Sequence, residues 1–194
     1  EIMMPYRQSA LNALNKISNF DIKIIAPSHG VIYTNPSKII EKYKEWVNGE
    51  TKKKVTIFYI SAWHHTEDIV KYLSDRINEK GIEVVVHNLE VADINKVIKD
   101  LVDSSAIIIA TPTIVENPHL LIIQIAYLIR ILRPPTKYIS LIVTYGWASV
   151  VEEQLKNILN REILKTVKIN VKPLENDIKN LNDLVEEIYN KLNQ

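Results

Sequence analysis

The feature that most constrains the fold of this chain is a strict alternation of strand-like and helix-like segments, which begins near Lys53 and continues to its last residues. Apolar and β-branched runs predict strands at residues 55–60, 82–87, 106–111, 138–144 and 163–171. Helical apolar spacing predicts helices at residues 66–80, 93–101, 120–132, 149–160 and 176–192. Each parallel crossover needs such a helix, so the pattern predicts an α/β fold with a doubly wound, five-stranded parallel sheet covered on both faces.

The residues before this pattern are organised differently. A short amphipathic helix is expected at 4–17, a brief strand at 22–26 and a second helix at 39–46, followed by the turn-forming linker Asn48-Gly49-Glu50-Thr51-Lys52. Single domains commonly hold about 100–150 residues, so residues 1–52 are too few to form one. We therefore expect an appendage at 1–52 and a domain at 53–194. Glu1 lies inside an apparent helix, so we also expect the natural protein to extend further toward its N terminus.

Composition excludes several classes of function. The 24 basic and 23 acidic side chains give a net charge of +1, and Lys52-Lys53-Lys54 is the longest run of like charge, so a nucleic acid partner is not expected. The chain has no cysteine, which excludes disulfides and thiolate metal sites in it and fits a cytoplasmic protein. No stretch approaches the roughly 20 apolar residues of a membrane span. Hydrolase, NTPase and dinucleotide glycine motifs are absent, and His87 and His119 are interpreted as surface or cap residues.

Ligands of doubly wound sheets bind at the carboxyl ends of the strands, where the strand order reverses. The loop after the first predicted strand, 61–66, carries hydroxyls at Ser61 and Thr66 beside a helix start, a pattern that suits a phosphate monoester. An equally open interpretation is that Thr66 is an N-cap that needs no ligand.

Two further loops lie at the same edge. After the third predicted strand, Pro112 and Pro118 stiffen a loop in which Thr113 offers a hydroxyl and an amide to a flat ligand. After the fourth, Tyr145-Gly146-Trp147 places two aromatic rings where a planar ligand could stack. The alternatives are an ordinary proline-limited connection and aromatic side chains that cover core or an interface.

Taken together, these segments resemble the C-terminal part of the flavodiiron proteins, also called A-type flavoproteins. The resemblance rests on Ala26-Pro27-Ser28-His29-Gly30, on Tyr43-Lys44-Glu45-Trp46 and on Tyr145-Gly146-Trp147, in that order. It implies that 1–52 is the C-terminal remnant of a metallo-β-lactamase-like diiron domain with its linker. It also implies that 53–194 is a flavodoxin-like domain with strand order 2-1-3-4-5 that binds FMN.

The resemblance also implies roles for individual residues. The FMN phosphate loop would contain Ser61, Trp63, His64, His65 and Thr66. The loops around the ribityl chain and the isoalloxazine ring would contain Thr111, Pro112, Thr113, Val115, Tyr145, Gly146, Trp147 and Ala148. His64, Val115 and Ala148 depart from the family, because they add bulk or remove a polar group where the family usually has glycine or asparagine. His29 resembles the last iron ligand, although one ligand cannot hold a metal pair.

The function implied is electron transfer from FMN toward a diiron site that reduces dioxygen or nitric oxide, with rubredoxin or a flavin reductase as the electron donor. The resemblance further implies a head-to-tail homodimer, and no reductase activity is expected from this chain alone. Two other hypotheses stay open. The first is that the domain has lost FMN and serves in interaction or assembly. The second is that it is a general flavodoxin-like electron carrier that works with separate partner proteins.

Overall fold

The computed structural model describes residues 4–147 and 149–194. The chain divides into two compact units between Glu50 and Thr51. In the second unit every strand-to-strand neighbour along the main sheet is parallel, as the alternating pattern predicts.

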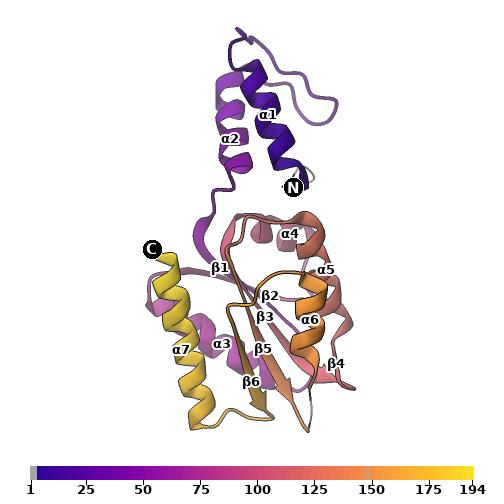
Figure 1. The fold of residues 1–194 in the computed structure, drawn as a ribbon, viewed down its shortest axis with the longest axis vertical. Coiled ribbons are helices and arrows are strands. Elements are labelled where there is room, and N and C mark those ends of the chain that lie inside the picture. Colours follow the sequence, from indigo (N-terminus) through magenta and orange to yellow (C-terminus); the bar gives the residue numbers. More distant parts are fainter. Residues whose placement is uncertain (1–3, 148) are drawn as a thin grey trace. The chain divides into compact units, whose positions relative to one another are not determined.

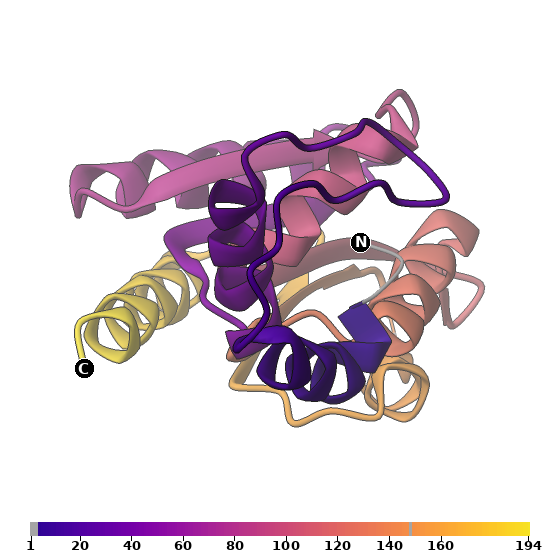
Figure 2. The same ribbon diagram turned by 90° about the horizontal axis from the view of Figure 1, so that it is seen from above.

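The first unit is built from a short 3-10 helix, Met4–Tyr6, and the helices α1, Arg7–Ile17, and α2, Pro36–Asn48, which pack against each other. Helix α2 ends at Gly49, whose φ of 72° is the left-handed conformation that glycine adopts without strain at helix ends. The loop from α1 to α2 runs outward and back (Figure 2). The strand predicted at 22–26 is wrong, because this loop contains only an isolated bridge between Ile25 and Tyr33. A lone segment without a neighbouring strand has no ladder to join.

The second unit contains the predicted sheet. Its strands are β1 Lys52–Tyr59, β2 Glu83–Asn88, β3 Ser104–Ile114, β4 Asn117–Pro118, β5 Tyr138–Tyr145 and β6 Lys165–Asn170. The order β2-β1-β3-β5-β6 is the 2-1-3-4-5 order of a flavodoxin-like fold, which confirms the predicted fold class. The short strand β4, which pairs antiparallel with the end of β3, was not predicted.

Helices cover both faces of this sheet (Figure 1). They are α3 His65–Glu79, α4 Ile94–Asp103, α5 Leu120–Leu132, α6 Val151–Leu159 and α7 Glu175–Leu192. Helices α3 and α7 bury their apolar sides on one face, where Leu73 and Leu184 contact the core around Ile108. Helices α4, α5 and α6 bury theirs on the other, around Ile107 and Ile109. Because β3 is covered on both faces, its apolar run is continuous rather than alternating.

A polar network replaces apolar packing near the start of β1. Lys54 is buried, with 2% of its surface exposed, and its ammonium group binds the carboxylates of Asp100, at 3.1 Å, and Asp103. His87 joins the network through Nε2, 3.0 Å from Asp100 Oδ2, and its ring stacks on Phe58. The interpretation of His87 as a surface or cap residue is therefore wrong, since its partners hold it against the sheet.

His119 confirms the cap interpretation. It precedes α5, and its Nδ1 accepts a hydrogen bond of 3.2 Å from the backbone N–H of Leu121. Among residues 4–147 and 149–194, no helix has the length and apolar character needed to cross a membrane.

Candidate functional site

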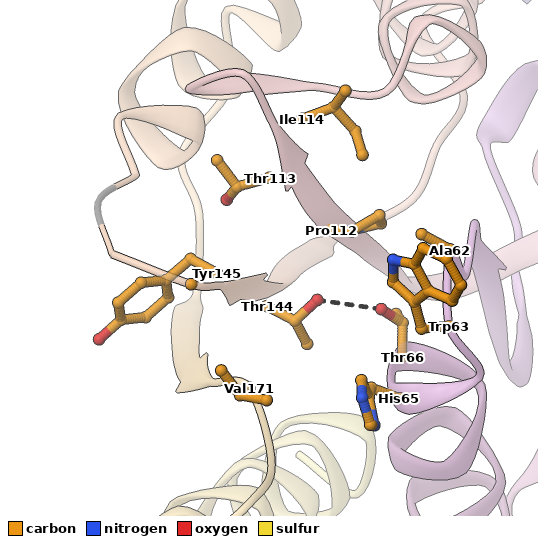
Figure 3. Close-up of a pocket in the computed structure, with 11 residues that line it drawn as sticks. Ala62, Trp63, His65, Thr66, Pro112, Thr113, Ile114, Thr144, Tyr145 and Val171 are labelled. Carbon is orange, nitrogen blue, oxygen red and sulfur yellow. Dashed lines mark hydrogen bonds between the residues drawn. The ribbon is translucent and has the colours of Figure 1, made fainter.

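A pocket of about 250 Å³ lies at the carboxyl ends of β1, β3 and β5 (Figure 3). At this point the chain reverses direction across the sheet, because β1 is followed by α3 on one face and β3 by α5 on the other. The pocket is lined by Ala62, Trp63, His65, Thr66, Pro112, Thr113, Ile114, Thr144, Tyr145, Gly146 and Val171. Its volume is slightly below the roughly 300–1,000 Å³ of pockets that enclose drug-sized ligands, so a larger ligand would remain partly exposed.

The connection from β1 to α3 forms the first wall. His64 adopts φ 62° and ψ −8°, a left-handed conformation, and thereby turns the chain into the first helical residue, His65. The Ser61 hydroxyl accepts a hydrogen bond of 3.2 Å from the Glu67 N–H. Within the described residues the N–H groups of His65 and Thr66 have no hydrogen-bond partner. Two donors at a helix start are thus available to an anion in the pocket.

Thr66 is not the N-cap that the sequence allowed as an alternative. It lies within the first turn of α3, and its hydroxyl is 3.0 Å from the Thr144 hydroxyl at the end of β5 (Figure 3). Both side chains are buried. The contact joins the first and third loops of the pocket, and Thr66 still lines the pocket surface.

The second wall is the end of β3, which turns back into β4. Val115 and Glu116 are the two turn residues, with φ values of 48° and 65°. Positive φ at both central positions is the pattern of a type I′ hairpin turn, which normally uses glycine or asparagine. The turn directs Val115 outward, where it is 84% exposed. Thr113 remains on the pocket side and donates a hydrogen bond of 2.9 Å to the Ser149 hydroxyl of the third loop.

The third wall comes from the residues after β5. Thr144, Tyr145 and Gly146 line the pocket. The end of β6 and the residue after it support them, because the Asn170 side-chain amide donates to the Gly146 carbonyl at 3.1 Å and the Val171 N–H donates to the Tyr145 carbonyl at 3.0 Å. A Cβ added to Gly146 would meet no atom within 4 Å, so no neighbouring group requires glycine at this position. Its lack of a side chain leaves open space on the pocket wall.

The lining residues give the pocket little charge. None of them is Lys, Arg, Asp or Glu, and His65 is the one imidazole among them. An ion cluster lies in the first turns of α3, where Glu67 contacts His64 Nδ1 at 2.8 Å and Lys71 Nζ at 3.0 Å. Hydrogen bonds from His64 and then from Lys71 lower the pKa of Glu67. The wall as a whole combines apolar groups with neutral donors and one histidine.

The structure gathers part of the predicted site. Of the residues predicted for FMN, those on the pocket wall are Trp63, His65, Thr66, Pro112, Thr113, Tyr145 and Gly146. The others do not line the pocket: Ser61, His64, Thr111, Val115 and Trp147. The Ser61 hydroxyl accepts a hydrogen bond from the Glu67 N–H, Thr111 is buried and donates to the Pro112 carbonyl, and Trp147 is 89% exposed. Ala148 lies outside the described residues.

Four lining residues were not predicted: Ala62, Ile114, Thr144 and Val171. Ala62 and Ile114 lie inside predicted loops but carry no functional group, and Thr144 was assigned to a strand. Val171 had no signal in the sequence, because only the pairing of β5 with β6 brings it to this edge.

His29 lies in the exposed loop between α1 and α2. Among residues 4–147 and 149–194 there is no group of three or more His, Cys, Asp and Glu side chains that could hold a metal ion. The assignment of His29 as an iron ligand stays a prediction.

Comparison with known proteins shows the family to which this chain belongs. It is 35% identical over 162 residues to a nitric oxide reductase from Moorella thermoacetica, covering 80% of this chain and 41% of that protein. It is 27% identical over 154 residues to a rubredoxin-oxygen oxidoreductase from Megalodesulfovibrio gigas, covering 76% of this chain and 38% of that protein. A solved flavo di-iron protein variant from Thermotoga maritima matches with a TM-score of 0.85 at 26% identity, covering 96% of this chain and 48% of that one. The chain is a flavodiiron homologue.

This flavodiiron homologue spans less than half the length of those relatives. It also matches a flavodoxin from the domain Archaea with a TM-score of 0.60, covering 73% of this chain and 99% of the flavodoxin. At 17% identity that match shows the fold alone. No protein-family model matches the sequence.

Proposed function

We propose that residues 53–194 form an FMN-binding electron-transfer domain of a flavodiiron-type oxidoreductase. The observation that carries this proposal is the pocket at the strand order reversal, which joins free N–H groups at the start of α3 to apolar and aromatic walls. The relationship to flavodiiron proteins supports it independently.

The donor set suits a flavin mononucleotide. The N–H groups of His65 and Thr66, with the Thr66 hydroxyl, would hold the phosphate. Pro112, Tyr145 and the exposed indole of Trp63 would contact the ring system, which needs large apolar surfaces. Bound FMN would supply the ability to accept and release electrons. The chain's own part is to bind the phosphate, orient the ring and limit access of water to it.

We further propose that residues 1–52 are the C-terminal part of a metallo-β-lactamase-like domain. His29 would then bind iron only together with ligands that this chain does not contain.

Dioxygen or nitric oxide would be the substrate of the whole protein, and this chain alone would not reduce either. One relative is called a nitric oxide reductase and another a rubredoxin-oxygen oxidoreductase. We propose rubredoxin or a flavin reductase as the electron donor, and a homodimer in the cytoplasm as the assembly; the name of the second relative supports rubredoxin.

The test is a titration of the purified, flavin-free chain with FMN, followed by absorption and by tryptophan fluorescence. Saturable binding is expected. Trp63→Ala is expected to weaken binding without affecting stability, since Trp63 is 81% exposed and lines the pocket. Trp46→Ala, which changes an indole of α2, is the matched control and should bind FMN like the unchanged chain. Absence of binding at high FMN concentration would contradict the proposal.

A second candidate is a flavodoxin-fold module that has lost FMN and acts in interaction or assembly. The left-handed backbone at His64 and Val115, where no glycine is present, favours it. The same titration separates the two candidates, because this module would bind no flavin.

A further inference from the structure

The pocket wall contains a single histidine. Of the lining residues only His65 and Tyr145 are ionisable. Phenols keep their proton at neutral pH, whereas histidine is the side chain that ordinarily gains or loses charge between pH 5 and 8. His65 is the one histidine among these lining residues.

The structure distinguishes the two neighbouring histidines. His64 turns away from the pocket, with its side chain 85% exposed and its Nδ1 2.8 Å from Glu67 Oε2. His65 lines the pocket, and among the described residues its imidazole has no hydrogen-bond or ion-pair partner. The ring of His65 is thus available to a ligand, while the ring of His64 is engaged by the protein.

A phosphate monoester carries about −1.5 to −2 charges at neutral pH. Without a cation, two N–H groups and a hydroxyl would have to compensate that charge in a pocket with few polar groups. An imidazolium adds a charge-assisted hydrogen bond, which is roughly twice as strong as a neutral one. We propose that the imidazolium form of His65 binds the flavin phosphate, so that FMN binds more tightly below pH 7 than above it. This inference rests on the proposed function.

Of the four carboxylates at the starts of α3 and α7, Glu67 and Asp177 have hydrogen-bond or ion-pair partners, whereas Asp68 and Glu175 have none among the described residues. Helix α3 carries Glu67 and Asp68 in its first turn, and Glu67 is held by His64 and Lys71. Helix α7 packs against α3 and begins with Glu175 and Asp177, of which Asp177 accepts a hydrogen bond of 2.9 Å from the Leu174 N–H.

The remaining elements add no further histidine and no carboxylate to the pocket lining. Strand β3 contributes Pro112, Thr113 and Ile114, and β5 contributes hydroxyls and the amide backbone. In the loop after β6, Lys172 follows the lining residue Val171. Lys172 is present in every protein compared below, so a difference between the His65 variants and the unchanged chain does not come from its removal.

The experiment compares FMN with riboflavin, which lacks the phosphate, at about pH 6 and about pH 8 and at constant ionic strength. Three variants are used: His65→Gln, a neutral donor; His65→Lys, a permanent cation; and His64→Asn, a matched control that tolerates the left-handed backbone. Dissociation constants come from fluorescence quenching, and thermal unfolding checks that each variant is folded.

At about pH 6, His65→Gln is expected to weaken FMN binding about tenfold relative to the unchanged chain, and at about pH 8 by less than about twofold. Riboflavin binding should change little at either pH. His65→Lys should bind FMN tightly at both, and His64→Asn should keep the pH dependence of the unchanged chain. The unchanged chain alone gives a second measure, since its preference for FMN over riboflavin should be larger at about pH 6.

FMN binding with the same loss in His65→Gln at both pH values would overturn this inference and leave the proposed function standing. An equal loss for riboflavin would also overturn it, because the phosphate would then not be the group recognised. If neither flavin binds at any pH, both this inference and the proposed function are wrong.

Discussion

The hydroxyl oxygens of Thr66 and Thr144 lie 3.0 Å apart, although 78 positions separate them in the sequence. Both side chains are buried at the pocket, one in the first turn of α3 and the other near the end of β5 (Figure 3). The hydrogen bond joins two of the three pocket loops and gives each of these largely buried hydroxyls a partner.

Replacing either threonine by valine is expected to lower the free energy of unfolding by about 1–2 kcal/mol, because the remaining hydroxyl is buried without a partner. The double variant Thr66→Val with Thr144→Val removes both hydroxyls and should lose less than the sum of the single losses. Urea denaturation of the four proteins measures this. Additive losses would show that the two hydroxyls are not coupled.

His64→Gly tests the left-handed backbone at the start of α3. The φ of 62° strains any residue with a Cβ, so glycine should raise the free energy of unfolding by up to about 1 kcal/mol and tighten FMN binding. His64→Ala is the control, since it removes the imidazole and keeps the strain. Thermal unfolding and FMN titration of both variants provide the measurement. A gain that is equal in alanine and glycine would rule out backbone strain as its cause.

Lys54→Met tests the buried ion network beside β1. The change leaves the carboxylates of Asp100 and Asp103 without their shared cation, so the free energy of unfolding is expected to fall by about 3 kcal/mol. Asp103→Asn added to Lys54→Met should recover part of that loss. Lys53→Met is the control, because Lys53 is exposed and binds only Asn193 and the Tyr189 ring among the described residues; it should change stability by less than about 0.5 kcal/mol. Equal effects of the two lysine substitutions in urea denaturation would refute this assignment.

Glu152 is expected to make stability depend on acid pH. Hydrogen bonds from Lys156 and then Lys168 lower the pKa of this carboxyl group from 4.5 to about 2. Because the folded-state pKa is below the unfolded one, its contribution is complete above about pH 4.5 and is lost as pH falls toward 2.

Glu152→Gln should therefore lower the free energy of unfolding by about 1 kcal/mol at neutral pH and leave it unchanged near pH 2. The expected value is small because both lysine partners are half-exposed and solvent screens their interaction with Glu152. Glu153→Gln is the neighbouring control, because Glu153 has no ion pair among the described residues. Denaturation curves from about pH 2 to 7 would contradict this prediction if the two variants behaved alike.

Much of the second unit was predictable because its signals are local. The helix at 120–132 was predicted with its observed bounds, since a long apolar segment beginning after His119 and ending before Arg133-Pro134 has few alternatives. The strand order followed from the flavodiiron resemblance and from the parallel crossovers. In contrast, the strand expected at 22–26 did not form, because strand formation depends on a neighbour that local sequence does not describe.

The sequence by itself determined the α/β class, the alternation of elements and the three loops in which a ligand site would lie, since these depend on periodicity and on turn residues close together in the chain. Only the tertiary structure decided which side chains face the pocket. It placed His65 on the wall and His64 outside it, brought Val171 to the site from the loop after β6 and paired Thr66 with Thr144. Those outcomes depend on backbone conformation at single residues and on strand pairing over long separations, and no local pattern records either.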